Sequence, residues 1–155
     1  MEIIKNLFIG DDASYERLKN NKGWSFLRCC KEGAGGHRQT LNYHTPGAPV
    51  GPNYLWVKRG NLLALNILDL EDPKMIPDEL FDKGLKFIDD RMKAGDKVLV
   101  ACNQGHSRSV GMVMLYLRSI GELPQSFARA KHIFKTIYSK EDIGKGIETH
   151  VRQRW

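Results

Sequence analysis

One short stretch of the sequence holds the residues best able to do chemistry. A thiol and a guanidinium are separated by five residues and followed by a hydroxyl, in the run Cys102-Asn103-Gln104-Gly105-His106-Ser107-Arg108-Ser109. A thiolate is a strong nucleophile, and the planar guanidinium of Arg108 matches two oxygens of a phosphate group. Gly105 permits the sharp turn that would bring the two together. The run therefore predicts a site where Cys102 meets an oxyanion such as phosphate.

The residues on either side indicate how this run is held. Residues 98–101 form a short, β-branched apolar run that predicts a strand, and residues 110–117 are apolar at helical spacing. Cys102 would then lie at a helix N-terminus, where free amide groups and the helix dipole favour anions and lower the pKa of a thiol. We expect the phosphate group to be bound by Asn103, Gln104, Gly105, His106, Ser107 and Arg108.

The run resembles the signature loop of the dual-specificity protein phosphatases, which belong to the cysteine-dependent Cys-x5-Arg phosphatases. The resemblance implies that Cys102 attacks phosphorus and forms a phosphocysteine intermediate, and that Arg108 binds the transferring phosphoryl group. It also implies that Ser109 assists departure of the thiolate. One position departs from the family pattern, because Ala101 stands where a histidine usually helps to set the loop and the thiol pKa. We expect a weakened or retuned site.

Cleavage of a phosphate ester also needs an acid that protonates the leaving oxygen, commonly a carboxyl group on a mobile loop. Asp69 lies 33 residues and Asp72 30 residues before Cys102, and both separations suit the aspartate that the resemblance implies. We favour Asp69 because it directly follows the predicted strand at 62–68. Asp72 would otherwise form a turn, and Glu71 is a weaker third candidate.

Hydrophobic periodicity predicts an α/β domain spanning residues 1–155. We expect three layers like those of the dual-specificity phosphatases, with a central, mainly parallel sheet of about five strands flanked by helices. In the helix expected at about 124–138, the predicted buried stripe is Phe127, Ala130, Ile133, Phe134 and Ile137.

A stretch rich in glycine and proline, at about 31–53, predicts a long loop without regular structure. Two interpretations are open. The loop is either a tolerated surface insertion, or it borders the active site and contacts substrate through His37, Arg38, Tyr43 or His44.

The composition is that of an ordinary globular protein, with 41% hydrophobic and 27% charged residues. Because no apolar run is long enough to cross a membrane and the N-terminus lacks the pattern of a signal peptide, we expect a cytoplasmic protein with no membrane contact. The three cysteines suit a reducing compartment, and no spacing of His and Cys predicts a metal site. We expect neither a metal nor another cofactor.

The net charge of +6 favours anionic partners, but Lys and Arg are scattered, which disfavours nucleic acid. We expect hydrolysis of phosphomonoesters in proteins, at phosphotyrosine and at phosphoserine or phosphothreonine. The alternative is a pseudophosphatase-type module that binds phosphorylated proteins with weak or no turnover, as Ala101 would allow. A thiol redox enzyme would need Cys29 or Cys30 to approach Cys102.

Overall fold

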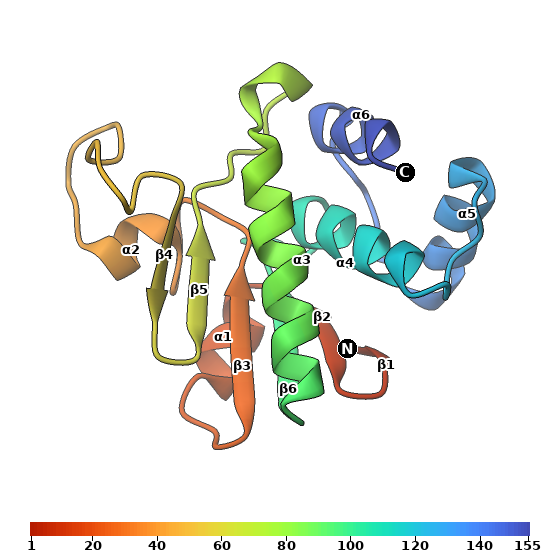
Figure 1. The fold of residues 1–155 in the computed structure, drawn as a ribbon, viewed down its shortest axis with the longest axis horizontal. Coiled ribbons are helices and arrows are strands. Elements are labelled where there is room, and N and C mark those ends of the chain that lie inside the picture. Colours follow the sequence, from red (N-terminus) through yellow and green to blue (C-terminus); the bar gives the residue numbers. More distant parts are fainter.

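The computed structural model describes residues 1–155 and is built on one six-stranded sheet (Figure 1). In chain order the strands are β1 (Glu2–Ile4), β2 (Leu7–Gly10), β3 (Trp24–Arg28), β4 (Trp56–Arg59), β5 (Leu62–Leu65) and β6 (Lys97–Ala101). The helices are α1 (Asp12–Leu18), α2 (His37–Leu41), α3 (Asp78–Lys93), α4 (Arg108–Ser119), α5 (Phe127–Ile137) and α6 (Lys145–Gln153), with a 3₁₀ turn η1 (Pro73–Met75).

The strands lie in the order β1-β2-β6-β3-β5-β4. The inner four are parallel, whereas β1 and β4 pair antiparallel with their neighbours at the two edges. The expected α/β class is confirmed, but the sheet is mixed and has six strands rather than about five. Each edge strand belongs to a short hairpin, and the turns of the two hairpins contain Asn6 at φ 68° and Gly60 at φ 55°. A turn of only two residues can join antiparallel strands but not parallel ones, so both edge pairings are antiparallel.

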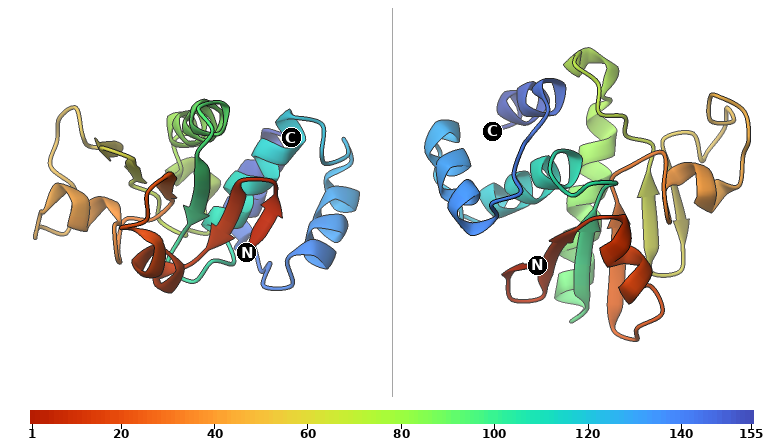
Figure 2. Two further views of the ribbon diagram at one scale, coloured as in Figure 1. Left: turned by 90° about the horizontal axis from the view of Figure 1, so that it is seen from below. Right: turned by 180° about the vertical axis from the view of Figure 1, so that it is seen from behind.

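The two faces of the sheet are covered unequally. In β6, Val98 and Val100 face a large core shared with α3, α4 and α6, whereas Leu99 and Ala101 face a small cluster that includes Tyr15 of α1. Figure 2 shows α1 on the opposite side of the sheet from α3. This arrangement confirms the three layers, and it places the end of β6 between helices on both sides.

Helix α5 contradicts part of the predicted buried stripe. Phe127, Ala130 and Phe134 are buried as expected, but Ile133 and Ile137 are 36% and 39% exposed. The helix begins at Phe127, capped by Ser126, and not at 124. A single helix face packs inward, so the apolar residues at 133 and 137 lie at its solvent edge.

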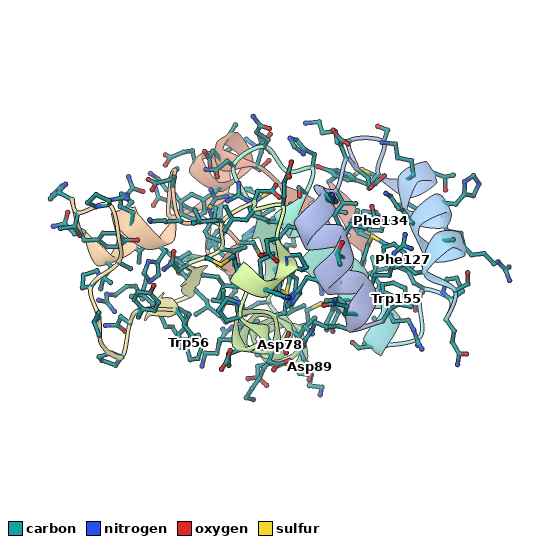
Figure 3. The ribbon with its side chains drawn as sticks, turned by 90° about the horizontal axis from the view of Figure 1, so that it is seen from above. Trp56, Asp78, Asp89, Phe127, Phe134 and Trp155 are labelled. Carbon is teal, nitrogen blue, oxygen red and sulfur yellow. The ribbon has the colours of Figure 1, made fainter.

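The C-terminal Trp155 is packed rather than extended. Its indole donates to the carbonyl of Pro124 at 3.2 Å. Its ring packs edge-to-face against Phe127, with the ring centroids 5.2 Å apart, and both residues are labelled in Figure 3. None of the helices combines the length and the apolar character that a membrane span requires.

The stretch at 31–53 is more ordered than the sequence predicts, because it contains the short helix α2. His37 is fully buried, with its ring nitrogens against the Tyr43 hydroxyl at 3.1 Å and the carbonyl of Asn53 at 2.7 Å. Arg38 donates to the carbonyls of Thr45 at 2.5 Å and Pro46 at 3.2 Å. These side chains form hydrogen bonds within the loop and so stabilise its conformation. The glycine and proline content of the stretch does not predict these hydrogen bonds.

Candidate active site

The run from Cys102 to Ser109 folds as a loop between the end of β6 and the start of α4. Gly105 has φ 76°, and a Cβ at this position would lie 2.9 Å from the carbonyl oxygen of Gly10. The Tyr138 hydroxyl donates to the Gly105 carbonyl at 2.8 Å. The glycine is therefore required both by the backbone angle and by the space.

The amide groups of this loop are left without backbone partners. None of the N–H groups of residues 103–107 donates to a backbone carbonyl. They precede the N-terminus of α4, a helix of 12 residues whose dipole adds positive potential there. Consecutive free amides at a helix start form an anion site.

The thiol of Cys102 is 2% exposed and lies beside this loop. Its Sγ is 3.2 Å from the hydroxyl oxygen of the fully buried Ser109. Burial alone raises the pKa of Cys102, but the Ser109 hydroxyl and amide, the Arg108 guanidinium and the Gly105 amide together lower it below the ordinary thiol value. The geometry thus favours a thiolate at this position.

The other two cysteines are in a different electrostatic state. Cys29 and Cys30 are fully buried, and burial raises the pKa of Cys30 to about 11 and that of Cys29 well above its usual value. All three thiols are free. Of the three thiols only Cys102 has a lowered pKa, so it is the one that ionises most readily and is the strongest candidate nucleophile.

This difference predicts selective alkylation. Because the thiolate reacts and the thiol does not, the rate of iodoacetamide reaction at Cys102 should rise with pH and level off above its pKa. Its midpoint should fall below that of a free cysteine. Peptide mapping of protein alkylated near pH 7 should find the label on Cys102 and not on Cys30. A midpoint at or above that of free cysteine would contradict the thiolate assignment.

Arg108 opens α4 and folds back beside the loop. Its Nη2 donates to the Asn103 side-chain oxygen at 2.8 Å and its Nη1 to the carbonyl of Ile67 at 3.2 Å. Its Nε is buried and has no hydrogen-bond partner. The carboxylate of Asp69 lies 3.9 Å from that nitrogen. A buried, unpaired N–H of a charged group is costly unless an acceptor binds it, so Arg108 is poised to receive an anion.

The structure separates the two candidate acids. Asp69 faces the loop, because its carboxylate lies near the Arg108 guanidinium. The same carboxylate would be 2.7 Å from a Cβ built on Gly144. The Gly144 amide in turn donates to the hydroxyl of Ser107 in the loop. Asp72 is exposed and caps η1, where it accepts the Lys74 amide at 2.9 Å. Only Asp69 is close to the Cys102 loop.

The side chains of the predicted phosphate-binding residues mostly contact other residues of the loop and neighbouring segments. His106 contacts Gln104 and the carbonyl of Asp142, the latter at 3.2 Å. The Ser107 hydroxyl accepts the Gly144 amide at 2.9 Å. These residues can therefore meet an anion through their amides rather than their side chains.

The start of the 31–53 loop borders this site. A Cβ on Gly33 would lie 2.3 Å from the side-chain Nδ2 of Asn103. The Lys31 amide donates to the carbonyl of Ile67, which also accepts a hydrogen bond from Arg108. Four side chains of this loop are proposed for substrate contact: His37, Arg38, Tyr43 and His44. Three of them form contacts within the loop itself, and only His44 is exposed.

Sequence reasoning missed three residues that contact the loop: Arg28, Asp12 and Tyr138. Arg28 is a charged residue between the apolar pairs Phe26-Leu27 and Cys29-Cys30, and this was the available signal. Asp12 and Tyr138 look like ordinary helix residues in the sequence. No group of three or more His, Cys, Asp or Glu side chains is arranged to hold a metal ion.

Parallel inner strands that deliver a buried cysteine to a loop of free amides, with an arginine folding back at the following helix, define a phosphatase-like fold. The chain has the fold of the dual-specificity phosphatases, as comparison with solved structures shows. Comparison with protein-family models finds no match to the sequence, and comparison with curated proteins finds none.

Three solved structures illustrate the likeness. A human tyrosine phosphatase-like serine/threonine/tyrosine-interacting protein is 22% identical, with 99% of this chain and 93% of that chain covered at a TM-score of 0.66. Human DUSP28 is 18% identical, with coverages of 98% and 92% and a TM-score of 0.65. A mouse protein described as a dual specificity phosphatase, complexed with zinc tungstate, is 18% identical, with coverages of 98% and 83% and a TM-score of 0.60. At these identities the likeness establishes the fold.

Proposed function

We propose that this protein is a cysteine-dependent phosphomonoester hydrolase. One observation carries the proposal: the Cys102 thiol lies at a loop of free amides, where the buried Nε of Arg108 has no partner. An oxyanion receptor built around a low-pKa thiol suits nucleophilic attack on a phosphate ester. A disulfide-exchanging enzyme has no need of such a receptor.

The first step transfers the phosphoryl group to sulfur. The Cys102 thiolate attacks phosphorus in line, and the loop amides and Arg108 bind the equatorial oxygens. An S–P bond forms while the P–O bond to the leaving group breaks. Asp69, acting as the acid, gives its proton to the leaving oxygen, so that an alcohol or phenol departs.

The second step releases phosphate. Asp69, now a carboxylate, accepts a proton from a water molecule that attacks phosphorus. The S–P bond breaks, and the thiolate is regenerated with inorganic phosphate as the product. The Ser109 hydroxyl, 3.2 Å from the sulfur, stabilises the departing thiolate by hydrogen bonding.

We propose phosphoproteins as substrates, with phosphotyrosine and phosphoserine or phosphothreonine both accepted. The side chain of Asp69 is 31% exposed and Gln104 at the rim is exposed, which suits a shallow site that short phosphoserine side chains can reach. A reactive thiolate must remain reduced, and this requirement is consistent with a cytoplasmic protein whose three cysteines are free.

The test compares wild-type protein with Asp69→Asn and Asp72→Asn on two aryl phosphates. Wild type should hydrolyse both. Asp69→Asn should lose roughly 100-fold in kcat/KM on phenyl phosphate, whose leaving group needs a proton, and much less on p-nitrophenyl phosphate, whose leaving group does not. Asp72→Asn, whose side-chain oxygen can still cap η1, should match wild type on both.

Two results would redirect the interpretation. Absence of wild-type turnover with retained binding of phosphotyrosine peptides would establish a pseudophosphatase-type binding module. A loss in Asp72→Asn equal to that in Asp69→Asn would contradict the assignment of Asp69 as the acid.

A further inference from the structure

The strand beside β6 contains a charged residue that the proposed reaction does not use. Arg28 ends β3, is 0% exposed and is paired in register with Ala101, the residue before Cys102. Its guanidinium lies 5.1 Å from the ring centroid of Tyr15. Burying a guanidinium costs free energy unless it is paired, so its partners indicate its role.

Arg28 has two hydrogen-bond partners, and both belong to the site. Its Nη1 donates to the carbonyl of Cys102 at 3.4 Å, and its Nη2 donates to the Oδ1 of Asp12. Asp12 follows the N-cap of α1, and its own amide donates to the carbonyl of Asn103 at 3.1 Å. Arg28 and Asp12 thus fix the backbone on both sides of the bond between Cys102 and Asn103.

The same contacts continue to Arg108 through the Asn103 side chain. The Nδ2 of Asn103 donates to the Oδ2 of Asp12 at 3.3 Å and to the carbonyl of Glu32 at 2.8 Å. With both N–H bonds directed at these acceptors, the Oδ1 must face the other way, and there it accepts the Nη2 of Arg108 at 2.8 Å. The amide orientation is therefore set by its acceptors.

We propose that Arg28, Asp12 and Asn103 are positioning residues that hold the Arg108 guanidinium in its anion-binding orientation. The hydrogen bonds connect Arg28 to Asp12, Asp12 to Asn103 and Asn103 to Arg108. They leave the Nε of Arg108 buried and without a hydrogen-bond partner, 3.9 Å from the Asp69 carboxylate, where an oxyanion can bind it. Ala101 suits this arrangement, because side chains paired in register on neighbouring parallel strands share a face, and a larger residue would compete with Arg28 for space.

The kinetic part of this inference rests on the proposed function, whereas the anion-binding part does not. The experiment therefore measures two quantities: the affinity for inorganic phosphate by calorimetry, and kcat and KM for phenyl phosphate. The variants are Asp12→Asn, Asn103→Ser and Arg28→Met. Asp12→Asn is isosteric, but it keeps only one of the two carboxylate oxygens. Arg28 and Asn103 each donate to a different one of these oxygens, so one of the two hydrogen bonds is lost. The matched control is Arg91→Met, which removes a part-buried ion pair with Asp96 at 2.5 Å, at the opposite end of the same strands.

We expect Arg28→Met and Asn103→Ser to weaken phosphate binding and lower kcat/KM by about 100-fold, and Asp12→Asn by about 10-fold, because a small displacement of a binding group has effects of this size. Arg91→Met should lower the unfolding temperature and leave both quantities unchanged. Should Arg28→Met not fold, Asp12→Asn and Asn103→Ser decide the question.

The inference is overturned if Asp12→Asn and Asn103→Ser bind phosphate and turn over substrate like wild type, or if they lose only thermal stability, as Arg91→Met does. If wild type binds phosphate but has no turnover, the proposed function fails, and the phosphate affinities of the variants alone support or overturn the network. If wild type binds no phosphate, both proposals fail.

Discussion

Hydrolysis of aryl phosphates should fall by about 10⁴-fold or more when Cys102 is replaced by serine. The serine hydroxyl is not ionised near neutral pH, so the groups that lower the pKa of the thiol have no nucleophile to stabilise. Losing a covalent nucleophile removes an entire reaction path, and such losses are among the largest that single substitutions produce. The measurement is kcat for p-nitrophenyl phosphate from about pH 5 to about pH 8, with phosphate affinity determined in parallel.

Two features make this result diagnostic. Cys102→Ser keeps the loop amides and Arg108, so it should still bind inorganic phosphate. Cys30→Ser is the matched control, because that thiol is buried, has a pKa raised to about 11 and should be dispensable. The wild-type rate should fall on the acidic side as the Cys102 thiolate becomes protonated. Retained turnover in Cys102→Ser would rule out a thiophosphate intermediate.

Replacement of Arg108 by lysine should lower kcat/KM by about 10³-fold. Lysine keeps the charge but cannot present two parallel N–H groups to phosphate oxygens. It also cannot maintain the contacts with Asn103 and Ile67 while its charge reaches the anion. Interactions with charge that develops in the transition state contribute factors of this size. The assay is steady-state hydrolysis of phenyl phosphate.

A second arginine on the same helix provides the control for this variant. Arg118 lies in the last turn of α4, and its Nε is also buried without a partner, but it is far along the helix from Cys102. Arg118→Lys should retain wild-type kcat/KM. Equal losses in Arg108→Lys and Arg118→Lys would mean that the effect comes from destabilising α4 and not from phosphate binding.

The local organisation of the site could be read from the sequence because it depends on neighbouring residues. An apolar strand, a turn that needs glycine at 105 and a helix opening at Arg108 are specified within about twenty residues, and the structure has each of them. The α/β class follows from periodicity in the same way, whereas the three layers were expected from the resemblance to the dual-specificity phosphatases. The number of strands was underestimated, at about five where the structure has six.

Contacts between distant segments were decided only by the tertiary structure. Asp69 and Asp72 are nearly equivalent in the sequence, and the choice between them comes from the packing of their loop against Arg108 and Gly144. The burial of Arg28 and its connection to Arg108 join segments that lie 80 residues apart in the chain, through Asp12 and Asn103. Periodicity and spacing describe a chain locally, whereas the position of a guanidinium or carboxylate relative to a thiol is set by which strands pair and in which register.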